Sequence, residues 1–579
     1  IKLSQMIADY LGQLYPQNQE AMLPWREIYG QFTEPPNPQM GEYAFACFNL
    51  AKVLKASPAA IAANLAQKIS PNEVASKVQN VGPYLNFFIH SEALGKDILA
   101  PILSQEFFNL TLVDQPQHIM IEYSQPNTHK VLHVGHMRNL CLGNAVVRLL
   151  RYLHHQVTAA TFPGDVGTHV AKCLWYLKFH QHTPPPPTHK GAWLGAIYSL
   201  ANNLLDDQEK TPQGDENKKQ LTQILKELEA KQGDYYEMWK ETRAWSLELF
   251  DEAYSWADIH FDRWYFESDV DSTSLELARE YYKKGLYVES EGAIGMDLAD
   301  RKLGFCIMIK SDGTGMYATK DIDLAQRKFH DFKLDRSVYI VDKRQAFHFK
   351  QIFATLDKLG FKEAKNCYHL EYDFVELPSG AMSSRKGNIV PLMDLVSKME
   401  QTIKDNYLTR YQGEWPPEEI SETARMLANG AIKFGMARID NQRKIVFEME
   451  EWLKLDGETG PYLQYVHARI HSLCQKLAYD PHQPVDWKVL SLPPEKAVMS
   501  KLAHFNTIVA MSAEQFKPSF LCSYLYDLGK LFNYFYTECP IGRAESAPLK
   551  TARLALSQAV GLTISKGLEL LGIGAPKRM

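Results

Sequence analysis

The pattern of apolar and polar positions changes along the chain and divides it into three predicted parts. In residues 1–110, helical spacing stands beside an extended stretch at 81–90, which predicts a compact α+β unit. In residues 111–400, short apolar runs alternate with helical patterns, as in a parallel α/β sheet. In residues 401–579, long helical periodicities predict an all-α helical bundle.

The middle part shows the order strand, loop, helix that opens a parallel α/β unit. The apolar run 119–123 predicts a buried strand, and the helical pattern after it passes through Leu140, Val147 and Leu150. Because further strand patterns recur between helical ones, we predict a doubly wound parallel sheet of the Rossmann type. Its other predicted strands are 307–310, 338–341 and 374–377.

Two stretches interrupt this α/β pattern, and we predict insertions at about 180–235. The proline-rich run 183–188 predicts a stiff connector of polyproline type. The polar tract 206–219 has few residues that a core could bury, so we predict an exposed loop there. Beyond about residue 420 strand patterns vanish, and no internal repeat is found.

Length and composition indicate a globular protein of several domains. With 579 residues, 45% of them hydrophobic and 23% charged, the chain can fill three to five cores. The net charge of −5 argues against coating nucleic acid indiscriminately, because such binding needs many cations. The last 39 residues nevertheless carry six Lys or Arg against two Asp or Glu, which permits a polyanion near the C-terminus.

The cysteines and the chain start favour a cytoplasmic protein. The eight cysteines stand singly, without a pair at metal-ligand spacing, which favours reduced thiols. The first 15 residues lack the pattern of a leader sequence, and no apolar run is long enough to span a membrane. We therefore expect no membrane association and no metal held by protein side chains.

A short string after the first predicted strand predicts phosphate binding. His133-Val-Gly-His136 stands where the loop turns into a helix, whose N-terminus offers free N–H groups and a positive dipole end. Gly135 lets a nucleotide approach the backbone, and the two imidazoles add donors. A single histidine in such a loop is more often a capping or packing residue. The whole string, however, resembles the HIGH signature of class I aminoacyl-tRNA synthetases and related nucleotidylyltransferases.

A second stretch, 381–388, follows about 250 residues later and combines serines, two cations and a glycine. Such residues suit a mobile loop that closes over a pyrophosphate leaving group, although a solvated turn has the same composition. The stretch resembles the class I signature KMSKS, but Ala381 and Ser384 stand where that signature has lysines. This departure puts the usual catalytic lysine in doubt.

The missing cation can come from Arg385 or Lys386, or from Lys130, three residues before His133. A lysine ahead of HIGH together with an altered second signature resembles the arginyl-tRNA synthetase branch. That resemblance covers nearly the whole chain, and its motifs follow the family's order. The motifs are 122–127, 164–168, 317–321, 341–345, 348–351, 460–469 and 575–579.

Recognition of arginine requires fixed carboxylates, because a guanidinium is permanently charged and pairs best with a bidentate anion. Glu122 ends the first predicted strand, and Tyr317 and Asp321 are spaced to share one face of a helix. In isolation, a Tyr/Asp pair at this spacing is usually a surface contact. The resemblance implies that Glu122 and Asp321 face the guanidinium and that Tyr317 lines the pocket.

The same resemblance implies the remaining roles at the active site. Asn127 and Gln345 hold the α-amino end of arginine, and Asp165, His348 and Gln351 are weaker candidates that could equally be scaffold. ATP is bound by Lys130, His133, His136, Met382 and Ser383, with Gly135 permitting close approach. The closing loop comprises Met382, Ser383, Ser384, Arg385 and Lys386.

The implied reaction is in-line attack of the arginine carboxylate on the α-phosphate of ATP. It gives arginyl-adenylate and pyrophosphate with Mg²⁺, and arginine then passes to the 3′ end of tRNA-Arg. Catalysis rests on positioning and charge stabilisation, so no covalent protein nucleophile is expected. The resemblance further implies that activation depends on bound tRNA and that the enzyme is a monomer.

RNA contacts are expected at both ends of the chain, because unstacked loop bases are held on aromatic faces. Most aromatic side chains at helical spacing lie in a core, so each candidate competes with that interpretation. In the N-terminal part, which resembles the family's added domain at the outer corner of tRNA, the candidates are Tyr84, Asn86 and Phe88. In the C-terminal part, which resembles the family's anticodon-binding domain, they are Tyr462, Tyr465, Arg469, Tyr536 and Met579.

Three other functions remain open. Another class I synthetase, for glutamine or cysteine, would share the nucleotide chemistry without the acidic pocket. A nucleotidylyltransferase with a HIGH-like loop would not need a helical RNA-binding part. An RNA-binding protein without activity would be free to lose both signatures.

Overall fold

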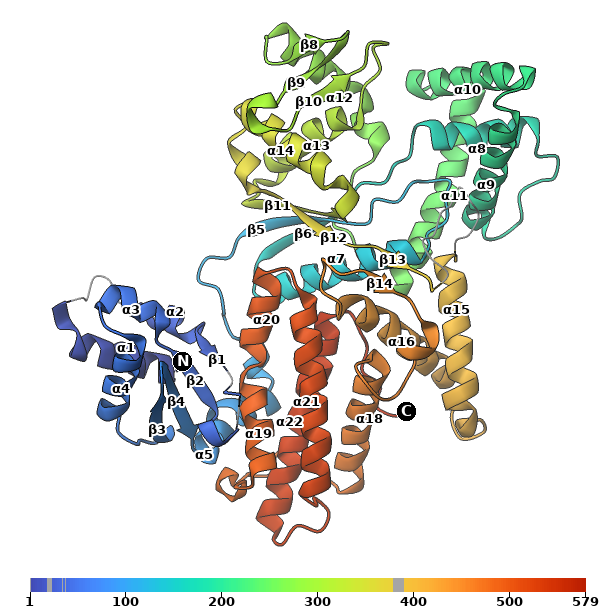
Figure 1. Cartoon of the computed structure of the whole chain (residues 1–579). Helices are drawn as coiled ribbons and strands as arrows, with labels where there is room; N and C mark the ends of the chain where they lie inside the picture. Colours follow the sequence, from blue (N-terminus) through green and yellow to red (C-terminus); the bar gives the residue numbers. More distant parts are fainter. Residues whose placement is uncertain (1, 18–22, 34, 37, 379–389) are drawn as a thin grey trace.

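The computed structural model describes the chain except for residues 1, 18–22, 34, 37 and 379–389. A parallel sheet lies at the centre, with the C-terminal helices on one side and a second α/β layer on the other (Figure 1). The N-terminal part stands beside the C-terminal helices, and a group of helices, α8–α11, projects from the sheet. The predicted fold class, a doubly wound parallel sheet between an α+β part and an all-α part, is confirmed.

All strand pairs of the five-stranded central sheet are parallel, and their order is β12-β11-β5-β6-β7. The strand of this sheet that comes first in sequence, β5, therefore lies between β6 and β11. The sheet grows from β5 in both directions, which makes β5 a switch point. Sheets of this kind bind ligands at the carboxyl edge of such a switch point. The strands are β5 (His118–Glu122), β6 (Gln156–Thr161), β7 (Arg263–Trp264), β11 (Arg336–Asp342) and β12 (Cys367–Tyr372).

Alternation along β5 assigns its side chains to two cores. Ile119 and Ile121 belong to the core shared with α7 (Val134–Tyr152) and the C-terminal helices. Met120 faces the opposite core, under α12 (Glu267–Lys283), α13 (Tyr317–Phe332) and α14 (Ala346–Lys358). Since successive side chains point to opposite faces, Glu122 lies on the α13 side at the carboxyl end of the strand.

Two of the predicted strands form, but in other sheets. The run 307–310 lies in β10 (Phe305–Ile309), which pairs antiparallel with β9 (Ala293–Asp297) in a small sheet completed by β8 (Val288–Ser290). The run 374–377 contains only β13 (Val375–Glu376), which pairs with β14 (Ile445–Val446). Both were wrongly assigned to the central sheet, because an apolar run identifies a strand and not its partner.

The polar tract 206–219 is helical, so the predicted exposed loop was wrong. It spans the end of α9 (Lys190–Gln208) and the first half of α10 (Pro212–Ala230). Pro212 occupies the first turn of α10, where its missing N–H costs nothing. Ile224 and Leu228 of α10 pack into a third core with α8 (Thr168–Phe179) and α11 (Asp234–Trp256).

The N-terminal part pairs a four-stranded antiparallel sheet, of order β1-β2-β4-β3, with helices. The predicted extended stretch is the end of β3 (Ala75–Val81) followed by β4 (Tyr84–Ile89). Leu85, Phe87 and Ile89 of β4 are buried in the core. The other elements are α1 (Lys2–Leu14), α2 (Trp25–Tyr29), β1 (Phe32–Thr33), β2 (Tyr43–Ala46), α3 (Phe48–Leu54), α4 (Pro58–Lys68), α5 (Ser91–Leu94) and α6 (Ala100–Leu103).

The C-terminal part is helical, as predicted, and its last residues, 572–579, run without regular structure along the helices. Four carbonyl oxygens of this tail accept hydrogen bonds from side chains of the helical part. Lys433 donates to Gly572, Gln464 to Gly574 at 2.8 Å, His467 to Pro576 at 2.8 Å and Tyr411 to Met579 at 2.7 Å. The helices are α15 (Leu392–Ile403), α16 (Pro417–Ala437), α17 (Met449–Trp452), α18 (Gly460–Lys476), α19 (Pro493–Ala503), α20 (Phe505–Glu514), α21 (Pro518–Glu538) and α22 (Ala547–Leu570).

All eight cysteines are buried and carry free thiols. Burial raises the pKa of several of them, Cys47 and Cys141 to about 12. None of the helices in the described part of the chain combines the length and the apolar character that crossing a membrane requires.

Candidate active site

The two histidines of the HIGH-like string form the N-terminus of α7. His133 is the N-cap residue, with extended backbone, and its Nδ1 accepts the hydrogen bond of the Gly135 N–H at 3.0 Å. His136 Nδ1 in turn accepts the His133 N–H at 3.1 Å, so the two side chains close a reciprocal capping box. The ring centroids lie 4.0 Å apart.

This arrangement fixes the protonation of both rings. Burial, helped by the positive charge of Lys130, lowers the pKa of His133 to about 4, and burial holds that of His136 well below its usual value. Both rings are therefore neutral at pH 7. Because each Nδ1 accepts a backbone N–H, the proton of each neutral ring is on Nε2, where it is available to a phosphate oxygen.

Gly135 is required where it stands, since a Cβ there would lie 2.7 Å from Cε1 of the His133 ring. The ammonium of Lys130 lies 4.7 Å from the ring centroid of Tyr198 on α9. After burial, its charge contributes to lowering the pKa of His133 and His136, so this cation lies near the N-terminus of α7. The predicted loop residues Met382, Ser383, Ser384, Arg385 and Lys386 lie outside the described residues.

Asp321 and Tyr317 lie on the first turns of α13, four residues apart as predicted. The carboxylate of Asp321 lies 2.6 Å from His348 Nε2, on α14. Burial lowers the pKa of His348, but this bond and the charge of Asp321 raise it more, so the net shift is upward. Tyr317 is 64% exposed, and Gln345 is exposed at the turn before α14.

Glu122 lies at the switch point, opposite Tyr339 of β11, and the charges of Glu122 and Asp321 both contribute to raising the pKa of Tyr339, after its burial. The two carboxylates thus lie at one edge of the sheet. Glu122, however, forms a buried ion pair with Lys328 of α13, and Gln125 Nε2 donates to it at 3.3 Å. Its charge is therefore already compensated within the protein.

A third carboxylate, Glu267 at the N-terminus of α12, lies near Asp321 and was missed by the sequence analysis. A Cβ on Gly164 would lie 2.4 Å from Asn127 Oδ1 and 3.5 Å from the Glu267 carboxyl carbon, so these three residues meet. Burial raises the pKa of Glu267 to about 7; Lys320 lowers it, and the charges of Asp165 and Asp321 raise it further. The sequence signal would have been an acidic residue that begins a helix after a strand.

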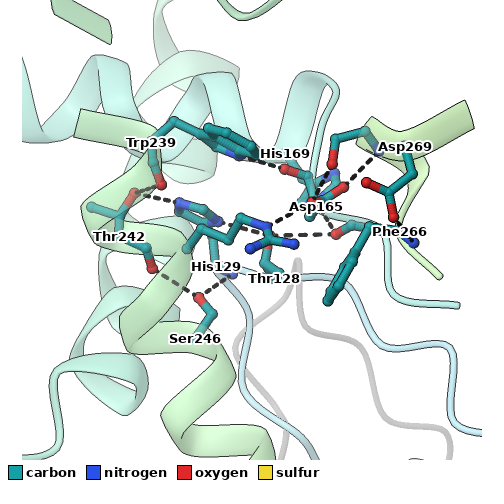
Figure 2. Close-up of polar contacts among 12 residues, drawn as sticks. Thr128, His129, Asp165, His169, Trp239, Thr242, Ser246, Phe266 and Asp269 are labelled. Carbon is teal, nitrogen blue, oxygen red and sulfur yellow. Dashed lines mark hydrogen bonds and ion pairs between the residues drawn. The ribbon is translucent and has the colours of Figure 1, made fainter. Parts of the chain in front are cut away.

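Asp165, predicted as a weaker candidate, is fully buried behind Gly164. Its carboxylate accepts hydrogen bonds from Ser268 N–H at 2.9 Å and from Ser268 Oγ at 2.7 Å, and it pairs with Arg243 at 2.7 Å. Figure 2 shows Asp165 between Trp239 of α11 and Phe266, the residue before α12. Gln351 donates to the Leu303 carbonyl at 2.8 Å, a contact that ties α14 to the turn before β10.

Of the N-terminal RNA candidates, Tyr84 is exposed, with its ring centroid 5.8 Å from that of Phe48. Phe88 lies on the same face of the sheet, half buried, beneath the ammonium of Lys77 at 4.9 Å. Asn86 is only 3% exposed, although it lies on the same strand between Ala44 of β2 and Gln79 of β3. The structure therefore does not present Asn86 on the surface.

Of the C-terminal candidates, Tyr465 is exposed, and the guanidinium of Arg469 lies 4.2 Å from the ring centroid of Tyr536. Tyr462 is only 8% exposed, because it packs between α18 and α21, where its hydroxyl accepts the Asn533 amide at 2.9 Å. It is thus a packing residue in this structure. The Met579 carbonyl accepts the hydroxyl of Tyr411.

No group of three or more His, Cys, Asp or Glu side chains able to hold a metal ion occurs in the described ranges.

Three family models match successive parts of the chain. Residues 2–89 match the arginyl tRNA synthetase N terminal domain, residues 99–448 the catalytic domain of the class I tRNA synthetases (R), and residues 463–579 the DALR anticodon binding domain.

Known proteins resemble the chain over its full length. It is 52% identical to an arginine–tRNA ligase of Bdellovibrio bacteriovorus, over 100% of this chain and 98% of that protein. An arginine–tRNA ligase of Treponema denticola is 32% identical, over 98% and 97%. The solved structure of the Thermus thermophilus arginyl-tRNA synthetase superimposes with a TM-score of 0.83 at 26% identity, covering 100% of this chain and 99% of that one.

Proposed function

Because the chain belongs to the arginyl-tRNA synthetases, a class I family of arginine–tRNA ligases, we propose how its own residues hold arginine, ATP and tRNA. The reaction joins arginine to tRNA-Arg at the expense of ATP. The assignment of roles to residues rests on the geometry at the carboxyl edge of the sheet.

Arginine occupies the pocket between the loop after β5 and the first turns of α13. Asp321 and Glu267 face the guanidinium, and Tyr317 covers it from the solvent side. Asn127 and Gln345 hold the α-amino end. Glu122 contributes mainly through Lys328: their buried pair fixes α13 against β5 and so sets the position of Asp321.

ATP lies at the N-terminus of α7. Neutral His133 and His136 donate from Nε2 to phosphate oxygens, Gly135 lets the chain of phosphates approach, and Lys130 supplies a positive charge. Donors held in place in this way stabilise the charge that develops on the leaving pyrophosphate. Met382, Ser383, Ser384, Arg385 and Lys386 are proposed to complete this site.

The chemistry is attack of the arginine carboxylate on the α-phosphate, with release of pyrophosphate, followed by transfer to the 3′ end of tRNA. Anchoring the guanidinium and the phosphates at opposite ends of one pocket lines up the two reacting groups. Mg²⁺ is proposed to enter with ATP, held by its phosphates, and to offset their charge.

The tRNA is proposed to lie across both ends of the chain. Residues 1–110, through Tyr84 and Phe88, contact its outer corner. Residues 401–579 hold the anticodon loop, through Tyr465, Arg469, Tyr536 and Met579. Residues 111–400 receive the acceptor end. We further propose that the enzyme acts as a monomer in the cytoplasm and needs bound tRNA to activate arginine.

The observation that supports this proposal is that Glu267 lies beside Asn127 and within the electrostatic influence of Asp321, at the edge of the sheet where His133 and His136 begin α7. Charging assays with each amino acid and total tRNA test it. Arginine alone should be attached, and ATP–pyrophosphate exchange should be negligible without tRNA. Charging with another amino acid would overturn the specificity, and full exchange without tRNA would overturn the dependence.

A single substitution tests the pocket. Asp321→Asn removes one anion facing the guanidinium, so KM for arginine should rise at least about 30-fold while KM for ATP changes less than about twofold. Asp323→Asn is the matched control, since that carboxylate lies on the same helix and pairs with Arg327. An unchanged KM for arginine in the first variant would remove Asp321 from the site.

A further inference from the structure

Helix α11 of the projecting helical group reaches the arginine pocket through one cation, Arg243. Its Nε lies 2.7 Å from Asp165 Oδ2, and its guanidinium lies 4.0 Å from the ring centroid of Phe266. Asp165 is completely buried, and Arg243 is the cation that pairs with it among the described residues. Arg243, on α11, therefore neutralises the buried negative charge of Asp165, which lies in the loop after β6.

Asp165 fixes two segments that carry pocket residues. Its carboxylate receives both the N–H and the hydroxyl of Ser268, which follows Glu267 at the start of α12. Its backbone carbonyl accepts Trp239 Nε1 at 2.7 Å, and it directly follows Gly164, against which Asn127 packs. Figure 2 shows these contacts converging on Asp165.

The same helix also braces the loop that carries Asn127 and Lys130. The buried ring of His129 bonds Thr242 of α11 at 2.8 Å and Thr128 at 2.9 Å, and Ser246 of α11 accepts the His129 N–H at 2.9 Å. Contacts from α11 thus reach both the loop at Thr128 and His129 and the segment at Asp165 (Figure 2).

We propose that Arg243 is a positioning residue for arginine: it holds Asp165, and through Asp165 it sets Glu267 and Asn127 around the substrate. This inference rests on the proposed function and extends it to a residue outside the pocket. In the described part of the chain, Arg243 pairs with Asp165 and lies over the rings of Trp239 and Phe266, away from the phosphate-binding turn, so we expect its effect on arginine and not on ATP.

Charge supplies a second route for the same effect. Glu267 is surrounded by Asp165 and Asp321, by Lys320 with its partner Asp271, and by Tyr317. Removal of Arg243 leaves the charge of Asp165 uncompensated next to Glu267. Repulsion then favours the protonated form of Glu267, and a protonated carboxyl attracts a guanidinium less strongly.

The test uses the full chain with tRNA and compares Arg243→Gln with the parent. KM for arginine should rise at least about tenfold, and KM for ATP should stay within about twofold. KM for arginine falls with rising pH, and the midpoint of this fall should move to a higher pH in Arg243→Gln. A merely structural role would not move this midpoint selectively. Arg243→Lys, which keeps the charge, should restore part of the affinity.

A second variant separates charge from shape. Asp165→Asn combined with Arg243→Gln removes the uncompensated carboxylate, so its KM for arginine should be lower than that of Arg243→Gln alone. Arg327→Gln is the matched control, because Arg327 ties α13 to Thr273 of α12 through Asp323 in a similar network.

The inference is wrong if Arg243→Gln leaves KM for arginine unchanged, or if both KM values rise together. It is also wrong if the double variant binds arginine no better than the single one. Failure of the proposed function has another signature, since Asp321→Asn would then leave KM for arginine unchanged as well.

Discussion

Burial changes the protonation of ionisable side chains at this site, and Glu267 is the main example. Its carboxyl lies among other acidic groups, so burial and repulsion raise its pKa to about 7. Below that pH the free enzyme holds a neutral carboxyl, which offers no charge to a guanidinium. If Glu267 faces the guanidinium as proposed, binding of arginine competes with protonation of Glu267.

KM for arginine is predicted to fall as the pH rises through about 7, and to level off above it. The sign follows because the raised pKa keeps Glu267 protonated on the acid side of the transition. Each pH unit below 7 should raise KM by at most about tenfold. Steady-state kinetics between pH 6 and pH 8.5 measure this, and Glu267→Gln should give a high KM with most of the slope removed. A steep slope in that variant would point to another group, such as His348.

Glu122 differs from the carboxylates proposed to bind arginine, because its negative charge is neutralised by the buried ammonium of Lys328. Glu122→Gln leaves the buried Lys328 ammonium without its anion, and such an unpaired charge costs about 3–5 kcal/mol. The free energy of unfolding, measured in urea, should fall by about this amount. The exposed pair of Arg301 and Asp357 is the control, since Arg301→Gln should cost less than about 1 kcal/mol. Equal losses in both variants would contradict the prediction.

Among the secondary-structure elements, α7 connects fold and chemistry most directly. Its first turn is closed by two side chains whose Nδ1 atoms accept backbone N–H groups, which leaves the proton of each ring on Nε2. The capping geometry and the donor geometry are therefore one arrangement, and a change to either disturbs both.

Gly135→Ala is predicted to impair ATP binding more than stability. The added Cβ would lie 2.7 Å from the His133 ring, which must then move and release its hydrogen bond to the helix. Loss of such a cap costs about 1 kcal/mol, but KM for ATP should rise at least about tenfold. Aminoacylation kinetics with varied ATP measure the change. Gly12→Ala in α1, where a Cβ has no neighbour within 4 Å, should leave ATP binding intact.

Elements with a strong pattern could be predicted from the sequence. The strand β5 is a continuous apolar run, and α7 has a clear helical period. In contrast, β12 was missed because polar residues such as His369 and Glu371 interrupt it, and α10 because most of its residues face solvent. Tertiary contacts, which the local pattern does not contain, decide these elements.

The candidate site divides in the same way. Residues within short motifs, such as His133, His136 and Asp321, could be proposed as site residues from their neighbours in sequence. Glu267 and Arg243 stand outside those motifs, and the roles proposed for them rest only on what the fold brings beside them. The partner of Glu122 is a further example, because Lys328 lies on a helix more than 200 residues later.

The whole molecule is tied together at its C-terminal tail. The buried ammonium of Lys433 donates to the Gly572 carbonyl at 2.6 Å and also to the carbonyl of Ala257, which ends α11. Asn144 and Arg148 of α7 approach the same two segments. The start of the tail is therefore fixed to the central α/β part, and its end is bound by Tyr411, which precedes α16.

Tyr411→Phe is predicted to weaken binding of tRNA selectively. The substitution removes the hydrogen bond to the Met579 carbonyl, worth about 1 kcal/mol, which corresponds to roughly fivefold in KM for tRNA. KM for arginine and for ATP should not change. Aminoacylation kinetics with varied tRNA test this. Tyr407→Phe is the control, since the Tyr407 hydroxyl bonds the Leu453 carbonyl instead.

Because every cysteine is buried, the reactivity of the thiols can report on local unfolding. Reaction with a thiol-specific dye requires a thiolate that water can reach, and the core both hides these sulfur atoms and disfavours their ionisation. In the native form, labelling must therefore wait for a part of the chain to open. Since the thiols are distributed over all parts of the fold, the order in which they are modified would map which part opens first.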